Sequence, residues 1–257
     1  GRAAALAEWT GARIHVLHVS SADELVTIAQ AKARGVDITS ETCPHYLLFD
    51  ETAYDTLGPI IRVNPPVREA HHQAGLWAGL ADGTLDMIAT DHAPHTRAEK
   101  TRNDIWAADC GFPGVETQMP LMLTQVARGR LSLADYVRLS SAAPARAFGL
   151  HPRKGALAPG SDADIAIVDL KRQETIRAEG LHSRGKITPF EAHETLGAPV
   201  HTLVRGRFVM RNRCLVEDTR GWGQSVTRVQ TMPQPQPAHT DQTLAAATGQ
   251  TLAQAAE

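Results

Sequence analysis

The fold class of this chain is decided by the stretch Leu85-Asp86-Met87-Ile88-Ala89-Thr90-Asp91-His92-Ala93-Pro94-His95, in which an apolar run ends in a polar cluster. The apolar run predicts a short buried strand, and Asp91 falls at its carboxyl end. In an α/β barrel and in a doubly wound sheet alike, functional groups lie at the carboxyl ends of parallel strands. The stretch therefore predicts an α/β fold with chemistry at Asp91.

Strands and helices alternate on both sides of this stretch. The sequence patterns predict strands at 13–19, 36–41 and 60–64 and helices at 1–9, 22–34, 68–82, 115–128 and 132–148. Such alternation over short connections is typical of a parallel sheet with crossover helices. Residues 91–114 form a connection that is long for a plain turn, which favours a functional lid.

The character of the sequence changes after residue 150. Residues 151–217 are rich in turns and contain apolar runs at 165–168 and 201–209, the second turning at Arg205-Gly206, so they predict a small β module. From 218 to 257 the chain becomes rich in Pro, Gln and Thr, a composition that predicts a flexible tail. We therefore expect a first domain at 1–150, the β module and the tail.

The composition narrows the classes of partner. The chain has 257 residues and a formal net charge of -2, which gives no general attraction to nucleic acid or an acidic membrane. No apolar run is long enough to span a bilayer. The three cysteines, Cys43, Cys110 and Cys214, form neither a disulfide framework nor a CxxC pair, which predicts a cytoplasmic location.

Asp91 and His18 are the leading candidates for chemistry. Asp91 is a carboxylate at a strand end followed by two histidines, and such a group can bind a metal and hold a proton. A capping aspartate on a turn is the structural alternative. His18 ends an apolar strand, so its ring is expected at the same end of the sheet, although a lone histidine there is more often structural.

Asn64 and His95 are weaker candidates for substrate contacts. Asn64 offers a donor and an acceptor to an amide edge, although an asparagine before proline is more often a turn residue. His95 either donates to a substrate anion or lies on a surface loop. Cys43, His45 and Tyr46 are ambiguous, and no partner pattern supports Cys43 as a nucleophile.

Five segments, in order, resemble the amidohydrolase superfamily, within it the cyclic amidases and most closely the dihydroorotases. The segments are His18-Val19-Ser20-Ser21, Glu41-Thr42-Cys43-Pro44-His45-Tyr46-Leu47, Val63-Asn64-Pro65-Pro66-Val67-Arg68, Thr90-Asp91-His92-Ala93-Pro94-His95, and Lys154-Gly155 with Gly160-Ser161-Asp162-Ala163-Asp164. The resemblance covers roughly residues 1–215. Thr42-Cys43-Pro44-His45-Tyr46 is more similar to allantoinases and hydantoinases, whereas Asn64 and the Asp91–His95 run are similar to dihydroorotase.

The resemblance implies a (β/α)8 barrel with a small β-sandwich beside it, and one or two zinc ions. It implies that His18 ligates zinc at the end of strand six, and that Asp91 at the end of strand eight binds metal and acts as general base. It further implies that Asn64 and His95 hold the substrate ring and its carboxylate, and that the backbone of Phe112-Pro113-Gly114 lines the pocket.

Three parts of the family's ligand set have no counterpart in this sequence: the His-x-His of the first strand, the bridging lysine or aspartate, and the histidine of the fifth strand. A full barrel takes about 250 residues, whereas only about 150 precede the β module here. The chain also starts at Gly1, inside a helical pattern without a cap. We therefore expect a chain that holds strands six to eight, truncated at its N-terminus and inactive alone.

The resulting hypothesis is a metal-dependent hydrolase of a cyclic amide C–N bond, most closely dihydroorotase, which interconverts dihydroorotate and N-carbamoyl-aspartate in pyrimidine biosynthesis. The alternatives are an allantoinase or hydantoinase-type cyclic ureide hydrolase and a non-catalytic dihydroorotase-like subunit. The expected partners are a small-molecule cyclic amide and further copies of the chain in a homo-oligomer, with neither nucleic acid nor membrane.

Overall fold

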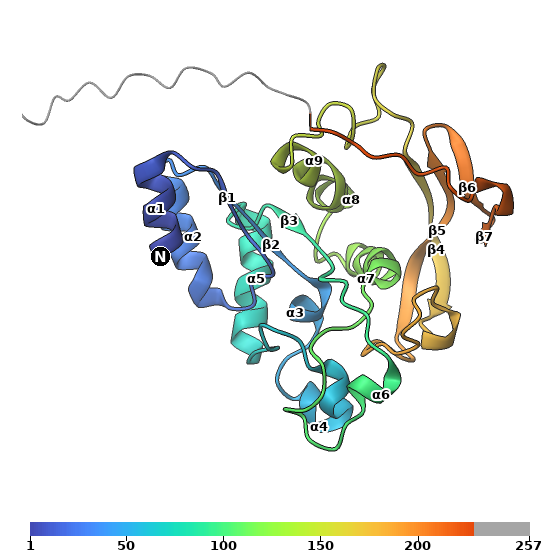
Figure 1. Cartoon of the computed structure of the whole chain (residues 1–257), viewed down its shortest axis with the longest axis horizontal. Coiled ribbons are helices and arrows are strands. Elements are labelled where there is room, and N and C mark those ends of the chain that lie inside the picture. The colour runs from blue at the N-terminus through green and yellow to red at the C-terminus, as the bar shows by residue number, and fades with distance from the viewer. Residues whose placement is uncertain (229–257) are drawn as a thin grey trace, which may run out of the picture.

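The computed structural model describes residues 1–228, and its first part is a small parallel sheet. The sheet has the order β1-β2-β3, with every neighbouring pair parallel. Its strands are β1 (Ile14–Val16), β2 (Ile38–Thr42) and β3 (Met87–Ile88). The prediction of an α/β fold with parallel strands is confirmed (Figure 1).

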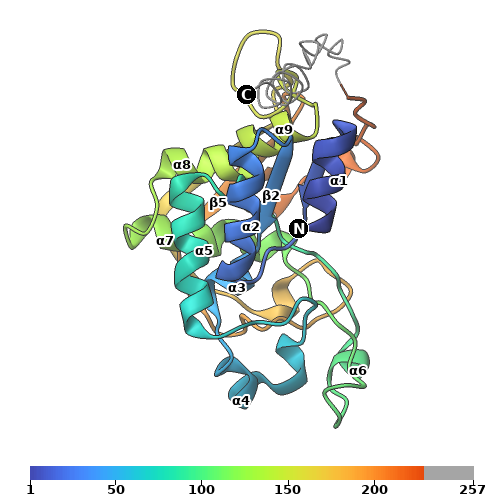
Figure 2. The same cartoon turned by 90° about the vertical axis from the view of Figure 1, so that its left-hand side faces the viewer.

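Helices cover one face of this sheet. They are α1 (Arg2–Thr10), α2 (Ala22–Ala33) and α5 (Ala70–Asp82), and Figure 2 shows α2 and α5 side by side. Ser21 and Glu24 form a capping box that starts α2. A Cβ at Gly75 would lie 2.4 Å from the Cβ of Ala22, so glycine is required where the two helices touch. The contact between α2 and α5 is continuous with the main hydrophobic core, which includes Leu25, Leu76 and Leu80.

The strand predicted at 60–64 is wrong. A 3-10 helix occupies Gly58–Ile61, and the chain then runs on without regular structure. The apolar side chains of Ile61 and Val63 are buried as the pattern implied. The carbonyl of Arg62, however, accepts hydrogen bonds from the backbone of Gly111 and the side chain of Lys100 instead of from a strand. Prolines on both sides remove backbone donors that a strand would need.

Short helices connect β2 to α5 and follow the long loop after β3. Pro44 begins α3 (Pro44–Leu48), because the fixed φ of proline suits a first helical turn. The remaining helices are α4 (Ala53–Leu57), α6 (Arg97–Lys100), α7 (Val115–Ala127), α8 (Leu133–Val137), a π-helix at Arg138–Ala142 and α9 (Ala143–Ala147), with α3 at Pro44–Leu48. The helices predicted at 115–128 and 132–148 are confirmed.

The β module is a single antiparallel sheet in the order β4-β5-β6-β7. Its strands are β4 (Ile165–Thr175), β5 (Glu194–Val204), β6 (Arg207–Arg211) and β7 (Cys214–Leu215), with 3-10 turns at Ala178–Gly180 and Glu217–Thr219. The hairpin predicted at Arg205-Gly206 joins β5 to β6. Within residues 1–228 the module contains no second sheet, so the sandwich is not part of the observed fold.

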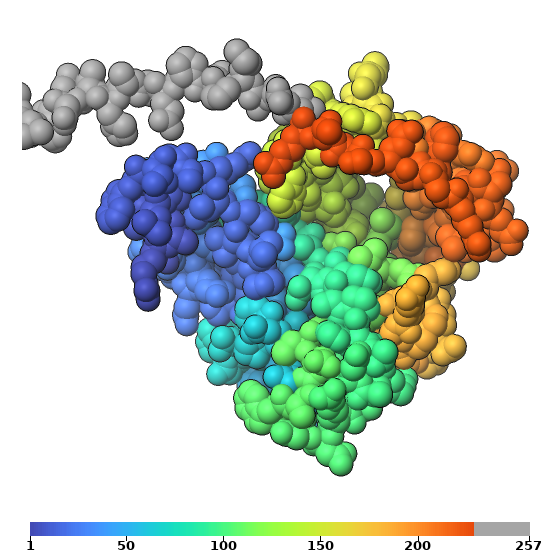
Figure 3. Space-filling view, in the orientation of Figure 1, coloured from blue at the N-terminus to red at the C-terminus, as the bar shows by residue number. Residues whose placement is uncertain are grey.

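The β module packs on α7. Gly197 of β5 approaches Leu123, where an added Cβ would lie 2.8 Å from the leucine Cβ. Beside this contact, a cavity of about 530 Å³ lies between α7–α9 and β4, lined mostly by apolar side chains. Figure 3 shows a hollow in the surface between the helical N-terminal part and the strands of the β module.

The predicted tail at 218–257 is described only in part. Trp222 packs against the β module, donating from its indole to the carbonyl of Val204 at 2.8 Å. Residues 229–257 of the predicted tail lie outside the described residues. Among residues 1–228 no helix has the length and apolar character needed to cross a bilayer, and all three cysteines are free thiols. The division at 150 and 217 remains a prediction.

Candidate active site

The parallel sheet brings His18 and Asp91 to the same edge. His18 lies two residues beyond β1, and Asp91 lies three residues beyond β3. The intervening β2 joins both segments, because Glu41 accepts from the backbone N–H of Val19 at 2.8 Å and Thr42 accepts from that of Ala89 at 2.9 Å. All three strands are parallel, so this edge collects their carboxyl ends.

Both residues have an unusual backbone conformation. The φ angle is 38° at His18 and 46° at Asp91, in the left-handed region that side chains other than glycine rarely adopt. Such conformations cost free energy and persist where the surrounding structure enforces them, and they cluster at functional sites. The two strand ends therefore turn sharply at the residues that the sequence singled out.

His18 has a free ring nitrogen suited to an additional partner. Its Nδ1 is enclosed and has no hydrogen-bond partner among the described residues, so the ring has a nitrogen without a partner in the fold. Asp91 is half-buried and adds a hard oxygen donor at the same edge. An imidazole and a carboxylate are a ligand set that zinc accepts, so these two residues fit the metal that the resemblance implies.

The floor of this edge is formed by residues of the β2–α3 turn. Cys43, His45 and Tyr46 are all buried. Burial, followed by the charges of Asp91 and Glu41, raises the pKa of the Cys43 thiol, so it is a poor nucleophile. Burial, with a smaller contribution from His18, lowers the pKa of His45 to about 3, so this imidazole is neutral. Sequence reasoning left these three residues ambiguous, although His45 follows a strand end just as His18 does.

The segment Phe112-Pro113-Gly114 is buried beside this floor. The ring of Phe112 meets that of His45 edge-on, with centroids 5.1 Å apart. His92 accepts from the backbone N–H of Gly114 at 3.1 Å and thereby ties the segment to the end of β3. A Cβ on Gly114 would lie 2.7 Å from the carbonyl oxygen of Thr90, so only glycine permits this approach. The segment thus lies beside His45 and the end of β3, and its role as a pocket lining stays a prediction.

Asn64 lies at the rim. It is exposed, and its neighbour Pro65 accepts a 2.7 Å hydrogen bond from the hydroxyl of Tyr46. Burial, followed by the charges of Cys43 and Asp91, raises the pKa of Tyr46, so its hydroxyl keeps the proton that it donates to Pro65. Being exposed, Asn64 is not enclosed with the buried side chains of Cys43, His45 and Tyr46.

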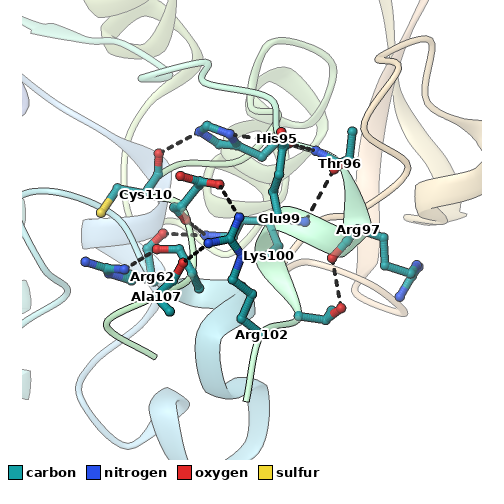
Figure 4. Close-up of polar contacts among 12 residues, drawn as sticks. Arg62, His95, Thr96, Arg97, Glu99, Lys100, Arg102, Ala107 and Cys110 are labelled. Carbon is teal, nitrogen blue, oxygen red and sulfur yellow. Dashed lines mark hydrogen bonds and ion pairs between the residues drawn. The ribbon is translucent and has the colours of Figure 1, made fainter. Parts of the chain in front are cut away.

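His95 is turned toward its own loop (Figure 4). Its Nε2 donates to the carbonyl of Cys110 at 3.0 Å, and its Nδ1 lies 3.7 Å from the carboxylate of Glu99. With Asp109, these side chains form a group that could hold a metal ion. The positive side chain of Arg102 lies 3.9 Å from the Asp109 carboxylate and competes with any cation there. His95 is therefore not directed at Asp91 in this arrangement.

Lys100 holds the loop at 91–114 in place. No sequence pattern had indicated this role. Its side chain is fully buried, and its amine donates to the carbonyls of Arg62 at 2.7 Å and Asp109 at 2.8 Å (Figure 4). Burial lowers the pKa of Lys100 to about 8. No sequence signal distinguishes a buried lysine in a polar loop from an exposed one.

Comparison with known proteins places these residues in a family. The chain is 41% identical over 231 residues to the L-hydantoinase of Paenarthrobacter aurescens, covering 88% of this chain and 50% of that protein. It is 44% identical over 215 residues to the dihydroorotase of Pelotomaculum thermopropionicum, covering 82% of this chain and 49% of that protein. The solved structure of the L-hydantoinase (dihydropyrimidinase) from Arthrobacter aurescens matches with a TM-score of 0.81 and 39% identity, covering 84% of this chain and 48% of that one.

The chain spans about half the length of these relatives. The chain is 41% identical to the hydantoinase and 44% identical to the dihydroorotase, so the comparison does not separate these two kinds of relative. The Amidohydrolase family matches residues 2–209, which include every candidate site residue discussed above. The chain belongs to the amidohydrolase family.

Proposed function

We propose that this chain forms part of a metal-dependent hydrolase of a cyclic amide C–N bond, with dihydroorotate as the substrate. The observation that carries the proposal is the placement of His18 and Asp91 at one sheet edge, both in left-handed backbone. Similarity to a dihydroorotase and to an L-hydantoinase supports the reaction class, because both names denote enzymes that act on cyclic amides.

Zinc is the proposed metal, in one or two copies, held here by His18 and Asp91. When bound, zinc would polarise the scissile carbonyl and make water acidic enough to lose a proton near neutral pH. Asp91 would accept that proton as general base and deliver it to the ring nitrogen, which leaves poorly until it is protonated. The buried rings of His45 and Phe112 would exclude solvent from one side of the site.

We propose that β1–β3 are strands six to eight of a (β/α)8 barrel and that β4–β7 belong to a small β-sandwich. The parallel order and the position of the site at the carboxyl ends of the strands support the barrel. The solved hydantoinase structure, matched over 84% of this chain, supports the same arrangement.

Dihydroorotate carries a carboxylate, for which we propose His95 and Asn64 as partners. To bind it, His95 must leave the Cys110 carbonyl or Glu99 must turn away, because Glu99 would repel a second carboxylate. This engagement of His95 favours a second candidate function, a hydantoinase-type hydrolase whose substrate has no ring carboxylate. The Thr42–Tyr46 turn, similar to hydantoinases in sequence, supports the same candidate.

A substrate panel tests the proposal. Dihydroorotate, hydantoin, dihydrouracil and allantoin would be offered with zinc to the longest natural protein that contains this segment. Hydrolysis of dihydroorotate, lost on Asp91→Asn, would support the first candidate. Turnover of hydantoin or dihydrouracil alone would favour the second. No turnover of any cyclic amide by a zinc-loaded protein would refute the reaction class and favour a non-catalytic subunit.

We further propose a homo-oligomer and a cytoplasmic location, with a role in pyrimidine biosynthesis if dihydroorotate is the substrate. The free cysteines are compatible with a reducing compartment. Size-exclusion chromatography with light scattering would test the oligomeric state.

A further inference from the structure

The cavity between α7–α9 and β4 is lined by apolar side chains that stay accessible. Its volume is about 530 Å³, and four of the large apolar side chains in its lining are exposed by 37% to 78%. They are Leu133, Val137, Phe148 and Leu157. Exposed apolar surface that is contiguous usually marks a contact with another segment or molecule.

The charged groups in the lining already have partners. Nζ of Lys154 lies 2.9 Å from the carboxylate of Asp162 and also contacts that of Asp164. Arg153 makes a second contact to the Asp162 carboxylate, at 2.9 Å. Charges paired in this way leave little to attract a ligand of either sign, so the lining favours an apolar occupant.

Residues 222–228 cross from the β module to the helices on the other side of this cavity. Figure 1 shows this segment in red, running from β6 and β7 toward α9. At its start, the indole of Trp222 donates to the carbonyl of Val204 at 2.8 Å. At its end, Arg228 lies against Gly149, because a Cβ built on the glycine would be 3.7 Å from the Cβ of Arg228. Gly149 comes two residues after the end of α9.

The residues after Arg228 begin at the rim of the cavity. Phe148 and Leu150, on either side of Gly149, both line it. Residues 229–257 follow in the sequence. An extended chain advances about 3.3–3.6 Å per residue, so four residues span about 13–14 Å. The first residues of this stretch can therefore reach into the cavity while the described part of the chain stays in place.

The sequence at this point offers apolar side chains at a regular spacing. Val226 is half-buried, whereas the other residues of 223–228 are exposed. Val229 and Met232 continue from Val226 at intervals of three. In an extended chain with three residues per turn, side chains at this interval share one face. Methionine is unbranched and fills irregular apolar gaps, which suits the wall of such a cavity.

We propose that residues 229–232 of this same chain dock in the cavity, with the side chains of Val229 and Met232 packed between α9 and β4. The docked segment joins the β module to the helices and covers apolar surface that is otherwise exposed to water. None of the candidate active-site residues, all of which the structure describes, lines this cavity. The inference therefore goes beyond the proposed function and does not depend on it.

Residues 229–232 of a second copy, or an unrelated apolar molecule, are the competing occupants. Docking within one chain is independent of protein concentration, whereas exchange between two copies increases with it. An unrelated molecule would be lost when the protein is unfolded and refolded in pure buffer, whereas the chain's own segment stays attached. Concentration and refolding therefore separate the three occupants.

The test compares the refolded chain of residues 1–257 with a shortened chain that ends at Arg228. The fluorescence of the dye ANS measures accessible apolar surface, and amide hydrogen exchange measures the protection of α9, each at several protein concentrations. Two point variants keep the full length of the chain. Met232→Asp places a charge in the proposed contact, and Thr231→Asp is the matched control, because its side chain lies outside the interval of three.

We expect ANS to bind weakly to the full chain and to Thr231→Asp, and several times more strongly to the shortened chain and to Met232→Asp. Amide exchange in α9 should be about tenfold faster in the latter two proteins, since losing the burial of one large apolar side chain costs about that factor. A synthetic peptide with the sequence of residues 227–234, added to the shortened chain, should reverse both changes. Circular dichroism checks that each form is folded.

Equal dye binding and equal exchange in the full and shortened chains would overturn the proposal. An effect of shortening that Met232→Asp does not reproduce would also overturn it, because another part of residues 229–257 would then be responsible. Changes that depend on protein concentration would assign the segment to the cavity of a second copy and exclude docking within one chain. None of these measurements involves zinc or turnover, so their outcome is separate from that of the proposed function.

Discussion

At the scale of single residues, backbone conformation and side-chain chemistry coincide at His18 and Asp91. Each residue sits at a left-handed φ just beyond a strand end, where the chain turns sharply. A residue with a short polar side chain tolerates this conformation better than a β-branched one does. The residue types required for the turn and for the chemistry are therefore compatible at both positions.

Asp91→Asn should remove nearly all hydrolysis in an active protein that contains this segment. Asparagine fits the left-handed backbone, so the fold is retained while the general base is lost, which costs about 10²–10⁴-fold in rate. The measurement is kcat/KM together with zinc content and circular dichroism. Activity within about tenfold of the parent would show that Asp91 is not the base.

His18→Asn should mainly reduce zinc content, because it keeps a residue tolerated at the left-handed φ but removes the imidazole. Elemental analysis of the purified protein measures the bound metal. His92→Asn is a suitable control, since the His92 ring accepts from the backbone at the start of α7. Equal zinc content in parent and His18→Asn would assign His18 a structural role.

Asn64→Ala and His95→Ala should raise KM for dihydroorotate while leaving zinc content unchanged. Hydrogen bonds to a charged group contribute about 1.5–3 kcal/mol, so KM should rise about ten- to a hundredfold. Hydantoin, which has no ring carboxylate, is the control substrate and should be affected less by His95→Ala. Loss of zinc at unchanged KM would place both residues in the metal site.

At the scale of elements, the long loop 91–114 is fixed by contacts that sequence patterns do not encode. Lys100 of α6 reaches back to the Arg62 and Asp109 carbonyls, while His92 holds the start of α7. An ammonium buried against backbone carbonyls is costly unless each donor finds an acceptor. The loop at 91–114 and the segment at 58–64 therefore stabilise each other's conformation.

Lys100→Met should change how stability depends on pH. Burial lowers the pKa of Lys100 to about 8, and an unfolded lysine titrates near pH 10.4. Between these values the unfolded chain binds more protons, so Lys100 makes the folded state more stable as pH rises through this window. The measurement is urea unfolding of the parent and of Lys100→Met at about pH 7.5 and about pH 10. The free energy of unfolding of the parent, relative to that of the variant, should be larger at the higher pH. If the free energies of unfolding of parent and variant differ by the same amount at both pH values, Lys100 is not the source of the pH dependence.

Periodicity predicted the long elements because their burial is local in sequence. Helices α2, α5 and α7 and strand β2 follow their apolar patterns closely. At 60–64 the same alternation is present and Ile61 and Val63 are buried, yet the backbone partners come from Lys100 and Gly111, distant in sequence. The alternation of apolar and polar residues indicates which side chains are buried. A strand also needs a neighbouring strand whose backbone pairs with it.

The candidate site could be predicted as far as strand ends define it. His18 and Asp91 were identified because each terminates an apolar run, and the structure places both at one edge. The orientation of His95 toward Cys110 and Glu99 depends on the fold of the loop, which no local pattern specifies. The role of His45 stayed ambiguous from the sequence, because its burial and its unpartnered ring nitrogen are properties of packing.

At the scale of the whole molecule, the two sheets share one core. Ile176 and Phe190 of the β module are buried in the same cluster as Leu76 and Leu121. On the opposite side, β1 has no neighbour beyond β2 within residues 1–228, and large apolar side chains near it are exposed, with Trp9 80% and Leu17 55% accessible. Exposed apolar surface beside an open strand edge is prone to association.

Residues 1–257 expressed alone should bind zinc weakly and should not hydrolyse dihydroorotate. The proposed site has two ligands in this chain, whereas a catalytic zinc usually has three protein ligands and one open position. Co-expression with the N-terminal half of the Pelotomaculum thermopropionicum dihydroorotase should raise zinc content and produce turnover, measured after joint purification. Robust turnover by the chain alone would mean that its own residues or a second copy complete the site.

The enclosure of Lys100 also bears on limited proteolysis. Trypsin must take a lysine or arginine side chain into its own specificity pocket, so a side chain that is fully buried is not available to it. Arg102, two residues further along the same loop, is exposed. A brief digest of the folded chain should therefore cut after Arg102 and spare the bond after Lys100, although the two bonds are neighbours in sequence. The ratio of the two peptides in mass spectrometry would then report, throughout a purification, on the fraction of molecules whose loop is closed over its lysine.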